Sequence, residues 1–219
     1  MSAKRSDDNS VGRALSALPD LVNCSMFLLA WIAPMALGAI WIKNLMITMI
    51  LEFLSVHSGG FIGTALVDPG KSRANKTRIV LVFGLFYMLF AAAFSLALEA
   101  WWPAAVFAWL LLAKFAQIWL VPLPGPVERT RQTFFIGFGV LCYVLGVFAT
   151  TFLPLPTLGI DADARAAAAI PGSGLWVDEP HRVIAFGALY FGAMAWAKWR
   201  WRPGTGLARS ASAPAPPAG

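Results

Sequence analysis

The sequence predicts an all-α protein, a polytopic bundle of six transmembrane helices. Hydrophobic residues make up 58% of the 219 residues and charged residues only 13%, whereas soluble domains carry about 25% charged residues. The apolar residues also gather in runs of about 20, the length at which a helix crosses the hydrocarbon of a bilayer. A water-exposed domain of this size would lack the polar surface to cover such runs, so the surrounding solvent is lipid.

Six segments have the length and composition of a span. The first two are separated only by "IKN" at 42–44, which predicts a tight helical hairpin, and the sixth segment is short. The predicted spans are 21–41, 45–67, 79–98, 103–122, 134–153 and 183–199.

The remaining segments complete the domain organisation. Residues 1–18 are polar and precede a run too long for a signal-peptide core, which predicts a cytosolic tail before an uncleaved first helix. Residues 19–203 form the membrane domain, and the Pro/Ala/Ser-rich residues 204–219 are predicted to be disordered. In the long connection 154–182, "DADARAAAAI" predicts a short surface helix with an aspartate near its start.

Basic residues are distributed unevenly between the two sides of the predicted bundle. Thirteen of the 17 Lys and Arg residues fall in the N-terminal tail, the 68–78 and 123–133 connections and the C-terminal end. Three fall on the other side: Lys43, Arg165 and Arg182. The positive-inside rule therefore places both termini in the cytoplasm. We predict a multi-pass protein of the cell (inner) membrane.

The same distribution identifies the expected partners. Because the net charge of +6 follows the connections, it is explained by topology and by contact of the cytosolic basic loops with anionic lipids. The bilayer is the predicted partner, together with a protein that packs against the helices. No nucleic-acid partner is predicted.

Polar residues inside the spans are the candidate site. Glu52 and His57 lie within the second span and Lys114 within the fourth, with Lys114 and His57 at a similar depth. Charged groups at that depth usually face the bundle interior and meet partners. A Glu52–Lys114 ion pair between spans two and four is the first expectation, and a protonated Glu52 bonded to Ser55 or Asn44 is the alternative.

Neighbouring residues extend this polar cluster. Ser55 shares a helical stripe with Glu52, and Gln117 lies one turn from Lys114. His57 lies about 140° from Glu52 on a regular helix, so these two side chains do not form a chelating pair unless "SGG" bends the helix.

Metal and cofactor chemistry has weaker support. The candidate metal ligands are His57 and Glu52 in the second span, and Asp178, Glu179 and His181 in "WVDEPHR", which is more simply the acidic start of a helix. The sequence contains no GxSxG, HExxH, CxxC, Walker or Rossmann motif, and its two histidines lie at different depths. No cofactor is predicted.

Three functions remain open on this evidence. The favoured one is a non-enzymatic binding or accessory protein for assembly, with a polar cluster buried between spans two and four. The first alternative is a small transporter or proton-coupled carrier that uses Glu52, His57 and Lys114. The second is an intramembrane enzyme that acts on lipids. A cavity that reaches these residues, and the direction in which it opens, would discriminate among them.

Overall fold

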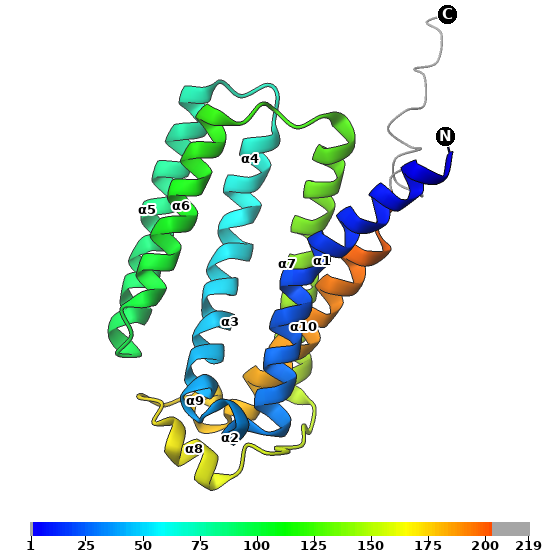
Figure 1. The fold of residues 1–219 in the computed structure, drawn as a ribbon. Helices are drawn as coiled ribbons and strands as arrows, with labels where there is room; N and C mark the ends of the chain where they lie inside the picture. The colour runs from blue at the N-terminus through cyan, green and yellow to red at the C-terminus, as the bar shows by residue number, and fades with distance from the viewer. Residues whose placement is uncertain (1, 203–219) are drawn as a thin grey trace, which may run out of the picture.

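The computed structural model describes residues 2–202, with side chains from Ser10 onward, and this part of the chain is helical without strands. The predicted C-terminal tail lies outside the described residues. Figure 1 shows the helices. In chain order they are α1 (Ser2–Ile32), α2 (Pro34–Leu37), α3 (Ile40–Ser58), the π-helix η1 (Gly59–Gly63), α4 (Thr64–Val67), α5 (Arg73–Ala97), α6 (Trp102–Leu120), α7 (Pro126–Phe152), α8 (Ala162–Ala168), α9 (Leu175–Asp178) and α10 (Pro180–Arg200).

The helical bundle is confirmed, with five helices long and apolar enough to cross a membrane. They are Ser10–Ile32, Ile40–Val67, Arg73–Ala97, Trp102–Leu120 and Pro126–Phe152. They correspond to the first five predicted spans, and residues predicted as the N-terminal tail continue into α1. The sixth predicted span lies in α10, whose apolar stretch is short because His181 and Arg182 precede it and Lys198 and Arg200 follow it.

The predicted boundary between the first two spans was wrong. The first helix ends at Ile32, and α3 already begins at Ile40, before the predicted "IKN" hairpin. Pro34 causes the break, since its ring disfavours the helical conformation in the preceding residue, and Ala33 has φ −142° and ψ 66°. Gly38 then adopts φ +92°, a conformation that favours glycine.

The short surface helix predicted in the long connection is present as α8. Asp161 precedes its first turn, and the carboxylate accepts a hydrogen bond from the backbone nitrogen of Ala164 at 2.8 Å. An aspartate in this position satisfies one of the unpaired N–H groups at a helix start. Helices α2, α8 and α9 gather at one end of the bundle (Figure 1).

Among the long helices, α10 buries the largest share of its residues. It packs along α1 and also contacts α3 and α7, while α5 and α6 form a hairpin against the other side of α3. Most residues of α10 are buried, among them Ile184, Phe186 and Tyr190. The residue type explains this position, because the alanines and glycines of α10 let neighbouring helices approach closely.

Glycine is required where α7 meets α10. A Cβ atom on Gly146 would lie 2.4 Å from the ring of Phe186, which is fully buried, whereas a Cβ atom on Gly137 of the same helix would meet nothing within 4 Å. Gly146→Ala should therefore lower the free energy of unfolding by about 1–3 kcal/mol through overpacking. Thermal unfolding in one detergent checks this, with Gly137→Ala as the matched control.

The control is expected to be neutral or slightly stabilising, because alanine favours a helix over glycine. Equal melting temperatures for the two variants would contradict the close α7–α10 packing.

Candidate functional site

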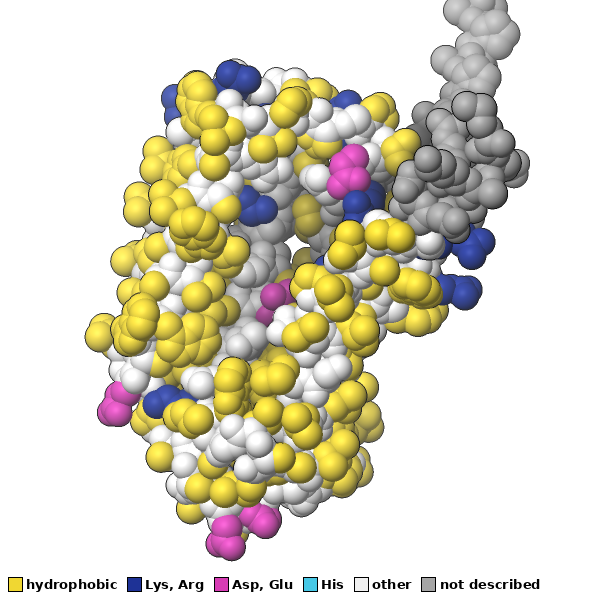
Figure 2. Space-filling model, in the orientation of Figure 1, with side chains coloured by type: hydrophobic (Ala, Val, Ile, Leu, Met, Phe, Trp, Pro, Cys, Tyr) yellow, Lys and Arg dark blue, Asp and Glu magenta, His cyan; other side chains and the backbone are white. Residues whose placement is uncertain are grey.

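A cavity of about 560 Å³, lined by both polar and apolar side chains, lies between α3, η1, α4, α6, α7 and α10. In Figure 2 the face toward the viewer is hollowed between α6 and α1, with charged side chains in the hollow and apolar side chains around it. The polar side chains that line the cavity are Glu52, Ser55, Lys114, Gln117, Glu128, Arg131, Gln132, Tyr190 and Lys198. The sequence-predicted residues Glu52, Ser55, Lys114 and Gln117 are thus brought to one cavity.

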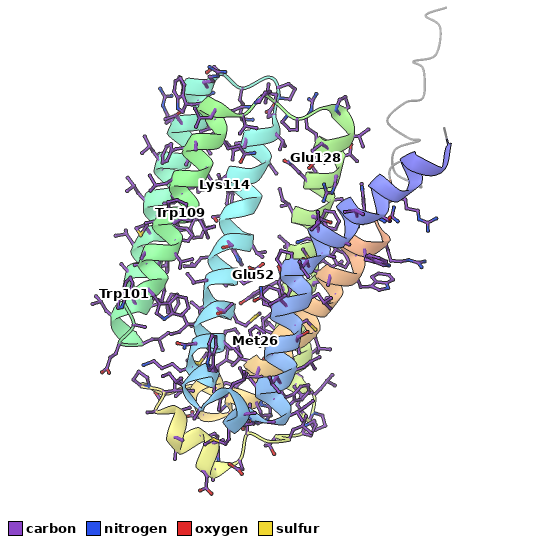
Figure 3. The ribbon with its side chains drawn as sticks, viewed as in Figure 1. Met26, Glu52, Trp101, Trp109, Lys114 and Glu128 are labelled. Carbon is purple, nitrogen blue, oxygen red and sulfur yellow. The ribbon has the colours of Figure 1, made fainter. Side chains whose placement is uncertain are left out.

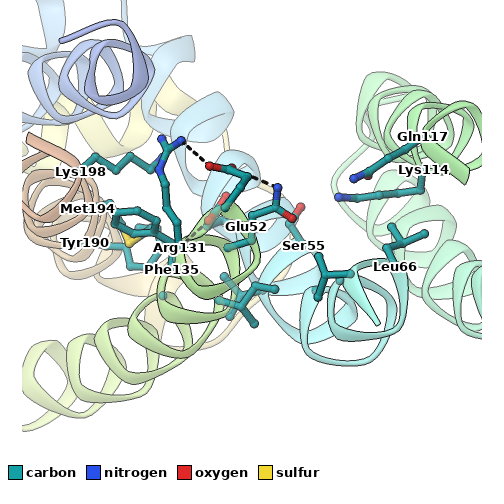
Figure 4. A pocket seen from close by; sticks show the side chains of 18 residues that line it. Glu52, Ser55, Leu66, Lys114, Gln117, Arg131, Phe135, Tyr190, Met194 and Lys198 are labelled. Carbon is teal, nitrogen blue, oxygen red and sulfur yellow. Dashed lines mark hydrogen bonds and ion pairs between the residues drawn. The ribbon is translucent and has the colours of Figure 1, made fainter. Parts of the chain in front are cut away.

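Glu52 has a different partner from the predicted one. The hydroxyl of Tyr190 on α10 donates a hydrogen bond to Oε1 of Glu52 at 2.6 Å, and no ion pair joins Glu52 to Lys114. The correction follows from the position of α3, since the side chain of Glu52 turns toward α10 and α7 and not toward α6 (Figure 4). Tyr190 also replaces Ser55 and Asn44, the partners expected for a neutral Glu52.

Aromatic packing holds Tyr190 in place beside Glu52. Its ring centroid lies 5.7 Å from that of Tyr143 on α7 and 5.2 Å from that of Phe191. The Tyr143 hydroxyl in turn donates to the carbonyl oxygen of Met49 on α3 at 3.0 Å. These contacts join α3, α7 and α10, so the position of the Glu52 carboxylate is fixed by the core.

Lys114 and Gln117 enter the cavity from the opposite wall. Both side chains extend from α6 toward the space in front of Glu52 (Figure 4), and Figure 3 shows Lys114 beside α6 and Glu52 farther along the bundle, between α3 and α1. Among the described residues, no side chain or carbonyl group forms a hydrogen bond or ion pair with the Lys114 ammonium. The cavity therefore contains an unpaired cation.

The other charged side chains of the cavity have partners. The ammonium of Lys198 lies 2.6 Å from the carboxylate of Asp20 on α1. Arg131 and Gln132 each donate to Glu128, at 3.2 Å and 3.1 Å. Asp20, Tyr190 and Lys198 were not predicted as site residues from the sequence, because only the packing of α1 and α10 beside the cavity brings them together.

His57 does not belong to this site. Its side chain is exposed, Nδ1 lies 3.2 Å from the carbonyl oxygen of Phe53, and its ring rests on the ring of Phe53 with centroids 4.1 Å apart. The π-helix begins at Gly59, after His57, so it does not turn the imidazole toward Glu52. The pair His57 and Glu52 is therefore excluded as a chelating pair in this conformation.

The acidic residues before α10 support local structure. Glu179 pairs with Arg182, and the hydrogen bond from that guanidinium lowers the pKa of Glu179. Asp178 accepts a hydrogen bond from the backbone of Gly174 at 3.1 Å, and Nε2 of His181 lies 4.0 Å from Glu179. In the described part of the chain, no three metal-ligating side chains form a group that could hold an ion.

Arg182 at the start of α10 also binds to the C-terminal end of α7. Its guanidinium donates to the carbonyl oxygens of Thr150, Thr151 and Leu153, at 2.9, 3.1 and 3.2 Å. These carbonyl groups end α7, where the helix itself supplies no donors. The stretch that resembled a ligand cluster in the sequence thus caps a neighbouring helix.

The geometry defines a class of protein. It is an all-helical protein with several helices apolar enough for a multi-pass membrane protein, and a cavity that contains charged side chains opens between those helices. No protein-family model matches the chain, and no curated protein or solved structure is significantly similar to it.

Proposed function

We propose that this chain is a multi-pass membrane binding protein that takes the polar head of a membrane-borne amphiphile into its lateral cavity. The observation that carries the proposal is Lys114, a cation without a partner that faces a cavity among apolar helices. A lysine at the centre of a span costs about 2.5–3.5 kcal/mol on insertion scales. An anionic ligand would compensate for that cost in the bound state.

The shape of the cavity favours a ligand that arrives from the bilayer. Its hollow is seen in a view across the helix axes, between α6 and α1 (Figure 2), and not only along them. The flanking helices expose apolar side chains such as Leu112 and Leu21, against which acyl chains would pack. The volume of about 560 Å³ lies within the range of about 300–1,000 Å³ typical of small-molecule sites.

We further propose that α10 is the sixth span and that both termini are cytoplasmic. Supporting this, α10 runs antiparallel to α1 (Figure 1), and the segments 68–78 and 123–133, which together carry six Lys and Arg residues, lie at the end of the bundle toward which α10 runs. Basic connections favour the cytoplasmic side. Reporter fusions after Gly70 and Gly125 should give a cytosolic signal, and a fusion near Ser173 an external one.

An external signal at Gly70 would contradict the proposed orientation. Signals on the same side at Gly125 and Ser173 would contradict a span in α7.

The binding proposal is tested with delipidated protein in detergent and a mixture of phospholipids as the probe. Added lipid should raise the melting temperature of the unchanged protein and of Lys43→Met, a control at the start of α3 outside the cavity. It should not raise that of Lys114→Met. Equal stabilisation of both variants, or no stabilisation of any protein, would overturn the proposal.

A proton-coupled carrier is the second candidate. It is favoured by the Glu52 carboxyl, a proton-binding group that lines the same cavity. A carrier would also need an opening toward the opposite side of the membrane in a second conformation. Reconstituted protein that moves a phospholipid between leaflets only under a pH gradient, and loses this with Glu52→Gln, would favour the carrier over the binding protein.

A further inference from the structure

We infer that the ligand is zwitterionic and joins an anionic phosphate to a primary ammonium, as in a phosphoethanolamine headgroup. This inference rests on the proposed function and names the class of its ligand. It follows from the two walls of the cavity, which carry opposite and complementary groups. On the α6 wall Lys114 and Gln117 offer hydrogen-bond donors, and on the opposite wall Glu52, Ser55 and the Tyr190 oxygen offer acceptors, while Lys198 on that wall is paired with Asp20.

The α6 wall fits a phosphate. Lys114 offers an ammonium whose three N–H donors have no acceptor in the described structure, and Gln117 follows one turn later with two amide N–H donors. Phosphate oxygens are strong acceptors for such groups, and a charge-assisted hydrogen bond is about twice as strong as a neutral one. Both side chains reach into the cavity side by side (Figure 4).

The opposite wall fits an ammonium. One oxygen of Glu52 accepts the hydroxyl proton of Tyr190, which leaves the second carboxylate oxygen and the lone pairs of the tyrosine oxygen to accept further bonds. Ser55, one turn from Glu52, adds a hydroxyl to the same wall. A primary ammonium has three N–H donors for these three groups, whereas a quaternary ammonium has none.

The remaining charges of the cavity explain why a ligand of one sign fits less well. Lys198 is paired with Asp20, and Arg131 is paired with Glu128. Among the described residues that line the cavity, one cation, Lys114, and one carboxyl, Glu52, are therefore left without an ion partner. A purely anionic headgroup would satisfy Lys114 but approach the carboxylate of Glu52 in a medium of low dielectric, where like charges repel strongly. A zwitterion compensates both groups.

The test compares four probes on delipidated protein in detergent by a binding titration, such as native mass spectrometry. The probes are phosphatidylethanolamine, phosphatidylcholine, phosphatidylglycerol and soluble phosphoethanolamine. The unchanged protein should bind phosphatidylethanolamine roughly tenfold more tightly than the other two lipids, the effect of one charge-assisted hydrogen bond. Phosphatidylcholine keeps the positive charge but has no N–H donors, so it measures the contribution of the donors. Phosphatidylglycerol has no positive charge, so it measures the contribution of the charge.

Two variants assign the preference to Glu52. Glu52→Gln should reduce the affinity for phosphatidylethanolamine to that for phosphatidylglycerol, while Glu99→Gln, an exposed carboxyl outside the cavity, should leave the preference unchanged. Tyr190→Phe keeps the packed ring but removes one of the three acceptors and the hydrogen bond that orients the Glu52 carboxylate, so it should weaken the preference even if Glu52→Gln proves unstable. The melting temperature of each variant without lipid controls for folding.

The outcomes separate this inference from the function on which it rests. Equal affinity for the three lipids, lost in Lys114→Met, would overturn the zwitterionic ligand and leave the binding function standing. Binding of no lipid would overturn both. Soluble phosphoethanolamine binding as tightly as the lipid would support the zwitterionic site and overturn its membrane-borne source.

Discussion

Replacing Lys114 with methionine should stabilise the ligand-free protein by about 1–3 kcal/mol, because it removes a charge that the fold leaves unpaired in an apolar layer. A lysine that serves only the structure would give the opposite sign, since its loss would remove a favourable contact. Within the described part of the chain there is no such contact, because the ammonium faces the cavity without a partner. Methionine keeps the length and flexibility of the side chain.

The measurement is unfolding of delipidated protein in detergent, by temperature or by denaturant. Lys43→Met is the matched control, because it removes the same charge from a site outside the cavity, and its effect should stay within about 0.5 kcal/mol. A Lys114→Met protein that is less stable than the unchanged protein would show that the lysine has a structural role. If Lys114→Met is more stable than the unchanged protein but no longer binds lipid, Lys114 serves function at a cost in stability.

Removing one member of the Asp20–Lys198 pair should cause the largest loss of stability. The two side chains join α1 to α10 at 2.6 Å and are only 11% and 24% exposed. Asp20→Asn leaves an ammonium without its counter-charge in a largely desolvated position, and breaking a buried pair in this way costs about 3–5 kcal/mol. Because Lys198 also lines the cavity and is not fully buried, we expect Asp20→Asn to lower the free energy of unfolding by about 2–4 kcal/mol.

A double-mutant cycle measures the coupling between these two charges. Asp20→Leu combined with Lys198→Met should recover much of the loss, because the double variant removes both charges of the pair and leaves neither without its partner. The Asp68–Lys71 pair is the control, since its side chains are 36% and 37% exposed and Asp68→Asn should cost less than about 1 kcal/mol. Strictly additive losses for Asp20 and Lys198 would show that they do not interact.

Sequence alone was sufficient where the signal is local. The all-helical membrane class and the first five spans follow from the length of the apolar runs, and α8 follows from an aspartate placed before an alanine-rich stretch. The helix break at Ala33 is also marked locally in the sequence, by Pro34 and Gly38. These two residues would have predicted the correct boundary between the first two spans. Each of these features depends on residues within a few turns of one another.

Tertiary structure decided which polar groups meet. The sequence predicted one polar cluster of Glu52, Ser55, Lys114 and Gln117, and all four residues line the cavity. It did not identify Tyr190 as the partner of Glu52, a contact between residues 138 positions apart, or the pairing of Asp20 with Lys198. The rotation of each helix about its axis, and the choice of its neighbour, are set by side-chain packing along the whole interface.

The position of α10 shows the same division most clearly. Of the six predicted spans of the described chain, it alone is too weakly apolar to qualify by composition as a membrane-crossing helix, yet most of its residues are buried against α1, α3 and α7. A helix surrounded by protein does not need the hydropathy of one that faces lipid, and small residues suit it because they permit close packing. Hydropathy measures the affinity of a segment for lipid, and only the assembled structure determines which segments are shielded from it.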